Sequence, residues 1–166
     1  MKQLIFISFI VLLVSCSISY KFNGASIDYS KTKTITIKDF SNIAPLVNPS
    51  FAPQFNDALR DIYTKQTRLS PVVSNGDLQI EGEITGYDLT PMSIGSDAIA
   101  SETRLTVTVN VRFTNKSNPD KDFEKSLSAF QNFSSNKMLT QVQDELCQAI
   151  IDELTETIYN QTVADW

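Results

Sequence analysis

The segment TRLTVTVNVRFTN, residues 103–115, alternates apolar and polar side chains without a break from Leu105 to Phe113. A period of two places alternate residues on opposite faces of a β-strand. One face of this strand is therefore expected to be buried and the other to meet water, which is typical of an antiparallel sheet covered on one side. This pattern constrains the fold more than any other in the chain.

Three further segments predict strands. TKTITIKDF, residues 32–40, and DLQIEGEITGYDL, residues 77–89, alternate in the same way. In the second, the even-numbered residues from Leu78 to Gly86 form one face, and the odd-numbered residues from Gln79 to Tyr87 form the other. KDFEKSLSAFQNF, residues 121–133, loses its alternation near Ala129 and Phe130, which predicts a β-bulge.

Two segments have helical spacing. Ser50 is expected to cap a helix that continues to about Thr67, and Thr140 with Gln143 matches the spacing of a capping box before a second helix. The apolar positions expected to be buried are Phe51, Phe55, Leu59 and Ile62 in the first helix, and Val142, Leu146, Ile150, Leu154 and Ile158 in the second.

The predicted fold class is α+β, in the order β-α-β-β-β-α. A crossover through the first helix pairs the first two strands in parallel, and the remaining strands continue as a meander. Both helices then cover one face of a four-stranded mixed sheet. The other face, rich in Thr, Asn, Gln and Glu, stays open to water or to a partner.

The N-terminus has the pattern of an export signal. Lys2 precedes an apolar run from Leu4 to Val14, which is too short to cross a membrane. The run ends in Leu13-Val14-Ser15-Cys16, which resembles a bacterial lipobox. We therefore expect cleavage between Ser15 and Cys16 and acylation of Cys16, with an ordinary cleaved signal peptide as the alternative. The predicted divisions are a signal peptide at 1–15, a lipidated tether at 16–32 and a single domain at 33–166.

Composition argues against several classes of function. The net charge of −5 disfavours a general affinity for nucleic acid or anionic lipid. The chain has no histidine, which removes the commonest general base and metal ligand. Glu81 and Glu83 are interpreted as solvent-facing strand residues rather than a catalytic pair. Cys147 has no partner if Cys16 carries lipid, and it is expected to be a small buried residue on a helix.

In the order and pattern of its segments, the chain resembles the lipopolysaccharide-assembly lipoprotein family LptE, in the variant found in Bacteroidetes. The resemblance rests on Cys16 followed by YKFNGASI, and on NDALRDIYTKQTRL, GDLQIEGEITGYDLTP, RLTVTVNVRFTN and VQDELCQAIIDEL. It implies a protein without enzymatic activity or cofactor, lipid-anchored in the outer membrane. Such a protein assembles with and plugs an LptD-type β-barrel translocon and binds lipopolysaccharide. The absence of an acidic run after Cys16 favours an anchor that faces the periplasm.

The predicted topology brings the 89–103 loop, the 133–140 connection and the 41–49 loop to one end of the sheet. This end is expected to bind acyl chains and phosphates of lipopolysaccharide. The residues predicted to do so are Met92, Ile94, Ile99, Arg104 and Lys137. The opposite turn, with Lys116, Lys121 and Lys125, is an alternative basic cluster, but acidic residues interleave with it.

Three other functions stay open at this point. The first is an auxiliary lipoprotein of an ABC-type transport or secretion system, which would copurify with an inner-membrane ATPase. The second is a periplasmic hydrolase, disfavoured by the missing histidines and by the lack of a Gly-rich nucleophile turn. The third is an inhibitor that fills the cleft of another enzyme.

Overall fold

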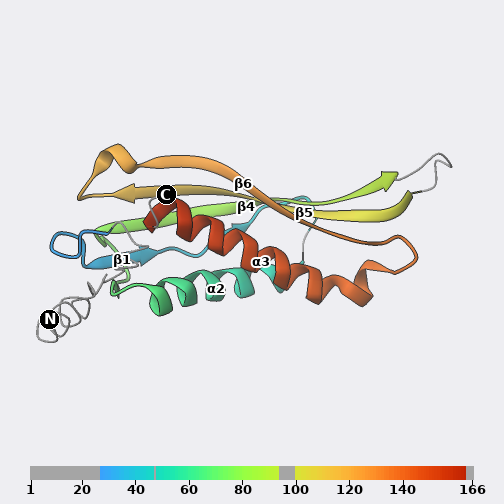
Figure 1. Ribbon diagram of the computed structural model, residues 1–166, viewed down its shortest axis with the longest axis horizontal. Helices are drawn as coiled ribbons and strands as arrows, with labels where there is room; N and C mark the ends of the chain where they lie inside the picture. The colour runs from blue at the N-terminus through green and yellow to red at the C-terminus, as the bar shows by residue number, and fades with distance from the viewer. Residues whose placement is uncertain (1–26, 47, 94–99, 164–166) are drawn as a thin grey trace, which may run out of the picture.

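The computed structural model describes residues 27–46, 48–93 and 100–163. The predicted signal peptide and residues 16–26 of the predicted tether, Cys16 included, lie outside these ranges. The elements follow in the order β1 (Thr34–Ile37), β2 (Ser41–Asn42), α2 (Phe51–Gln66), β3 (Ser70–Pro71), β4 (Leu78–Ser93), β5 (Ala100–Asn115), the 3-10 turn η1 (Pro119–Lys121), β6 (Phe123–Ser134) and α3 (Leu139–Val163). Both helices lie on one side of a twisted sheet (Figure 1).

The sheet has six strands among the described residues, in place of the four predicted. Its order is β3-β1-β4-β5-β6, and β2 also pairs with β4. The pairing of β1 with β4 is parallel, and β4, β5 and β6 form an antiparallel meander, so the predicted connections of the four main strands are confirmed. The added strands β2 and β3 have two residues each. Elements that short cannot produce a visible alternation in the sequence.

The core lies between the sheet and the two helices. The predicted positions Phe51, Phe55 and Leu59 of α2 are fully buried, whereas Ile62 is only partly buried and Tyr63 takes the deeper position. On α3, Leu146, Ile150, Leu154 and Ile158 are buried as predicted, and Val142 is partly buried. Within the described residues, neither helix combines the length and the apolar character that a membrane span needs.

The helix caps differ from the predicted ones. Ser50 does stand before α2, but its side chain makes no capping bond. The Asn48 side-chain oxygen instead accepts bonds from the Ser50 N–H and hydroxyl. At the start of α3, the Gln141 side chain accepts a bond from the Met138 N–H at 3.1 Å, while the Gln143 amide donates to the Tyr87 hydroxyl. The capping box of Thr140 and Gln143 is therefore wrong, because Gln143 serves tertiary packing.

The bulge in the sheet lies in β4 rather than in β6. The ladder between β5 and β6 runs without a shift from Phe113 opposite Phe123 to Glu102 opposite Ser134, so the bulge predicted near Ala129 is wrong. Along β4 the register shifts between Ile84 and Gly86.

The sheet has one face packed against the two helices (Figure 1). We call the face on the other side of the sheet the open face.

Candidate functional site

The predicted site lies where β4 ends and β5 begins. Strand pairing continues to Ser93 opposite Ala100, so most of the predicted 89–103 loop is instead a projecting two-stranded arm. Only residues 94–99 fall outside the described strands, and Ile94 and Ile99 therefore lie outside the described residues. Figure 1 places the turn from β6 into α3 at the same end of the molecule. We call this region the distal end, comprising residues 89–93, 100–104 and 133–138.

Met92 and Arg104 lie on the open face of the distal end. Thr90 stands opposite Arg104 and Met92 opposite Glu102, and this register places the four side chains on one face. The Arg104 Nε donates a hydrogen bond to the Asn132 side-chain oxygen at 3.0 Å. Its guanidinium carbon also lies 3.9 Å from the centre of the Phe130 ring. Arg104 is thus held in place by a stacked aromatic ring.

Lys137 lies in the turn between β6 and α3. Its side chain is exposed, and its N–H donates to the Ser134 carbonyl at 2.9 Å. Because Ser134 pairs with Glu102, the turn begins beside the arm that carries Arg104. The structure thus brings Met92, Arg104 and Lys137 to one end, as the sequence predicts.

The 41–49 loop does not reach the distal end. It starts from β2, which pairs with Glu83 and Ile84, in the middle of β4. The Ile43 N–H continues this contact by donating to the Ile84 carbonyl at 2.9 Å. Ile43 and Leu46, in this loop, are large apolar side chains that remain exposed. The short parallel pairing of β2 fixes the loop beside the centre of the sheet, which the sequence did not reveal.

A buried polar cluster, not found by sequence reasoning, lies beneath the 41–49 loop. The predicted burial of Cys147 on a helix is confirmed. Its sulfur accepts a hydrogen bond from the Asn48 amide at 3.4 Å and lies 3.6 Å from the Tyr87 hydroxyl. Burial raises the pKa of Tyr87 to about 12, so this phenol stays neutral. The cluster joins the loop, β4 and α3, and its thiol is inaccessible to a substrate.

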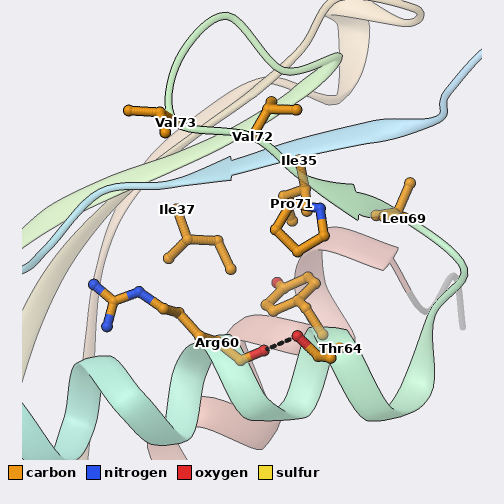
Figure 2. Close-up of a pocket in the computed structure, with 9 residues that line it drawn as sticks. Ile35, Ile37, Arg60, Thr64, Leu69, Pro71, Val72 and Val73 are labelled. Atoms are coloured by element: carbon orange, nitrogen blue, oxygen red, sulfur yellow. Dashed lines mark hydrogen bonds between the residues drawn. The ribbon is translucent and has the colours of Figure 1, made fainter.

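A concave region lies between the β1–β3 edge of the sheet and α2 (Figure 2). It encloses about 320 Å³ and is lined mainly by Ile35, Ile37, Tyr63, Leu69, Pro71 and Val72. In Figure 2, Ile35 and Ile37 point from β1 toward the helix, and Arg60 lies at one end. The Arg60 guanidinium is paired with Asp39 and Asp57. The groove offers mainly apolar contact, and the Thr64 hydroxyl on its lining donates a hydrogen bond to the Arg60 carbonyl at 2.9 Å.

The open face also carries a row of ion pairs away from the distal end. Glu81 contacts Lys38 at 2.6 Å and Arg112 at 3.2 Å, and Arg112 contacts Glu124 at 3.0 Å. The hydrogen bond from Lys38 lowers the pKa of Glu81. Exposed pairs of this kind contribute little stability. Glu81 thus lies on the solvent-facing side of β4, as its place in the alternation predicts.

Comparisons with known proteins found a matching family model and solved structures that share the fold. A family model described as LptE, lipopolysaccharide-assembly, matches residues 32–162. None of the curated proteins matches the chain.

Three solved structures share the fold at low sequence identity. A minor lipoprotein from Acinetobacter baumannii is 15% identical with a TM-score of 0.51, and the match covers 78% of this chain and 91% of that one. An uncharacterized lipoprotein B from Nitrosomonas europaea is 15% identical with a TM-score of 0.50, covering 76% and 79%. Rare lipoprotein B from Shewanella oneidensis is 6% identical with a TM-score of 0.50, covering 78% and 90%.

Proposed function

The chain belongs to the LptE family of lipopolysaccharide-assembly proteins, and on that premise we propose that it is a lipoprotein anchored by Cys16 in the outer membrane, facing the periplasm. It assembles with and plugs an LptD-type β-barrel partner and binds lipopolysaccharide as this lipid is inserted. The match to the family model over residues 32–162 is the observation that carries the proposal. The protein acts by binding, without a cofactor or a catalytic residue.

The chemistry of the distal end supports this role. Large apolar side chains are exposed there or close by: Met138 is 68% exposed, Phe130 46% and Leu89 39%. Basic side chains, Arg104 and Lys137, belong to the same end. Lipopolysaccharide combines acyl chains with phosphates, and such a mixed apolar and basic surface can contact both.

Reversal of charge at Lys137 tests the proposed phosphate contact. We expect Lys137→Glu to weaken binding of labelled lipopolysaccharide about tenfold, because a hydrogen bond to a charged group contributes about 1.5–3 kcal/mol. The variant should keep the melting temperature of the parent, because Lys137 is exposed in a turn. A pull-down with labelled lipopolysaccharide measures the change.

Lys125→Glu is the matched control, since it makes the same charge change in the alternative basic cluster. Lys125 is exposed and lies over the Phe123 ring at the opposite end of the sheet. Its reversal should leave lipopolysaccharide binding unchanged. An equal loss in both variants would indicate a general charge effect, and a loss in Lys125→Glu alone would assign the site to the other end.

The arm formed by β4 and β5 is expected to face the barrel partner. A photocrosslinking amino acid placed in turn at positions 91–100 should capture the barrel in the native outer membrane. The same probe at Asp61, on the exposed surface of α2, serves as the control. Capture of the barrel from Asp61 but from none of the positions in the arm would contradict this orientation.

Purification from the native outer membrane tests the proposed function as a whole. The tagged full chain should copurify with an outer-membrane β-barrel protein and with lipopolysaccharide, both identified by mass spectrometry. Copurification with an inner-membrane ATPase complex would instead support the ABC-type alternative and contradict the proposal.

A further inference from the structure

The two edges of the sheet are built differently. The β3 edge consists of Ser70 and Pro71, and a proline there has no N–H to offer another strand. The opposite edge is β6, twelve residues long and paired with β5 on one side only within the described chain. Natural proteins protect edge strands by keeping them short, bulged, charged or interrupted by proline. The β3 edge is protected in this way.

The second half of β6 has none of these protections. The residues from Leu127 to Ser134, LSAFQNFS, include no charge, no proline and no glycine. The ladder that joins this stretch to β5 has no register shift. In an antiparallel pair, alternate residues direct their N–H and C=O groups away from the partner. This stretch therefore presents a regular row of backbone donors and acceptors along its outer side.

Apolar side chains on β6 are also incompletely covered. Phe123, Leu127 and Phe133 face the helices but are only partly buried. On the open face, Phe130 remains 46% exposed even with Arg104 stacked on it. A strand added beside β6 would cover side chains on both faces while it paired the outer backbone groups. The row of outward-facing backbone groups and the incompletely covered side chains thus both fit an added β-strand.

We propose that the outer edge of β6, from Leu127 to Ser134, accepts an extended segment of the barrel partner as an additional strand of this sheet. The inference rests on the proposed function, because the occupant belongs to that partner. On the helix-facing side, beside Leu127 and Gln131, the segment is expected to be uncharged, since a charged side chain there would be desolvated without a counterion.

The extent of the surface favours the barrel over a second copy of this chain. A stable complex buries about 1,200–2,000 Å² in total, and one strand pair of eight residues supplies only part of this area. A second copy joined through β6 alone would therefore dissociate readily. A partner that also meets the distal end, where Leu89 and Met138 are exposed, adds the missing contact.

Hydrogen exchange on the full, lipidated chain tests the proposal. In the free protein, the outward-facing amides of residues 127–134 should exchange at least a hundredfold faster than the alternate amides bonded to β5. In the complex with the copurified barrel, the outward-facing amides should become protected to a similar degree. Unchanged exchange in a complex that does contain the barrel would overturn the inference and leave the proposed function intact.

Two lysine substitutions provide a second measurement. Gln131 lies on the edge strand β6, where its side chain is half-buried on the helix-facing side. Gln131→Lys should reduce the amount of barrel that copurifies at least fivefold, because a lysine on an edge strand opposes pairing with another strand. Thr114→Lys adds the same charge at a half-buried position of the central strand β5 that does not pair with Leu127–Ser134, and it should leave recovery unchanged. Equal recovery with both variants would count against β6.

The remaining outcomes also decide the question. Protection of the β6 amides in the free protein that disappears on dilution would identify a second copy as the occupant and overturn the proposal. Failure of any barrel to copurify with the unsubstituted chain would overturn the proposed function, and the inference with it.

Discussion

Replacing Gly82 with alanine should lower the free energy of unfolding by about 3 kcal/mol and the melting temperature by about 6–12 °C. Gly82 lies in β4, opposite Val111 of β5. A Cβ atom at this position would overlap the Asn110 carbonyl oxygen and the ring of Phe40. Phe40 cannot move away easily, because its N–H donates to the buried Asn56 side chain at 2.9 Å and its ring packs edge-on against Phe55.

Gly86→Ala on the same strand is the matched control. Its Cβ would stand 3.1 Å from the side chains of Asp88 and Thr108 on the open face, where both can adjust. We expect its free energy of unfolding to stay within about 1 kcal/mol of the parent. Thermal unfolding followed by circular dichroism compares the two variants. Equal melting temperatures would show that Phe40 does not pack beneath Gly82.

The contrast between β5 and the short strands shows what the sequence pattern can predict. From Leu105 to Phe113 one face of β5 is buried along its whole length, so the alternation is complete and the strand is predictable. The ends of β4 and β5 beyond Leu89 have no such pattern. They are strands because each supplies ladder hydrogen bonds to the other, and that pairing is a tertiary property.

Two aromatic residues illustrate why the sheet face on which a side chain lies is harder to predict than the strand itself. Tyr87 and Phe130 both break the alternation of their strands. In β4 the register shift after Ile84 turns Tyr87 toward the helices, where it is 4% exposed, so its predicted place on the open face is wrong. In β6 the backbone stays regular, and Phe130 remains on the open face beneath Arg104. The same sequence signal thus has two structural solutions.

The sequence predicts which segments of the chain meet at the candidate site, but not the contacts between their side chains. The meander alone places Arg104 and Lys137 at one end of the sheet. The stacking of Arg104 on Phe130 depends on the register between β5 and β6, and the groove beside α2 depends on the two residues of β3. Neither of these features has a signal in the spacing of residues.

The second large effect concerns Cys16, which lies outside the described residues. We expect Cys16→Ala to abolish incorporation of a labelled fatty acid and to transfer the protein from the detergent phase to the aqueous phase in a detergent partition. Each buried methylene of an acyl chain contributes about 0.8 kcal/mol to membrane binding, and two or more chains make the anchor effectively permanent.

Cys147→Ala supplies the control, because it removes the other cysteine of the chain. Cys147 is 1% exposed, packed between Asn48 and Tyr87, and inaccessible to an acyltransferase. This variant should incorporate the fatty acid fully and remain in the detergent phase, with at most a lower melting temperature.

A parent protein whose N-terminal peptide carries no lipid, or a Cys16→Ala variant that still takes up the label, would remove the anchor from the proposed function. The family assignment would stand, since it rests on residues 32–162, and the proposed place at the outer membrane would then depend on the proposed barrel partner alone.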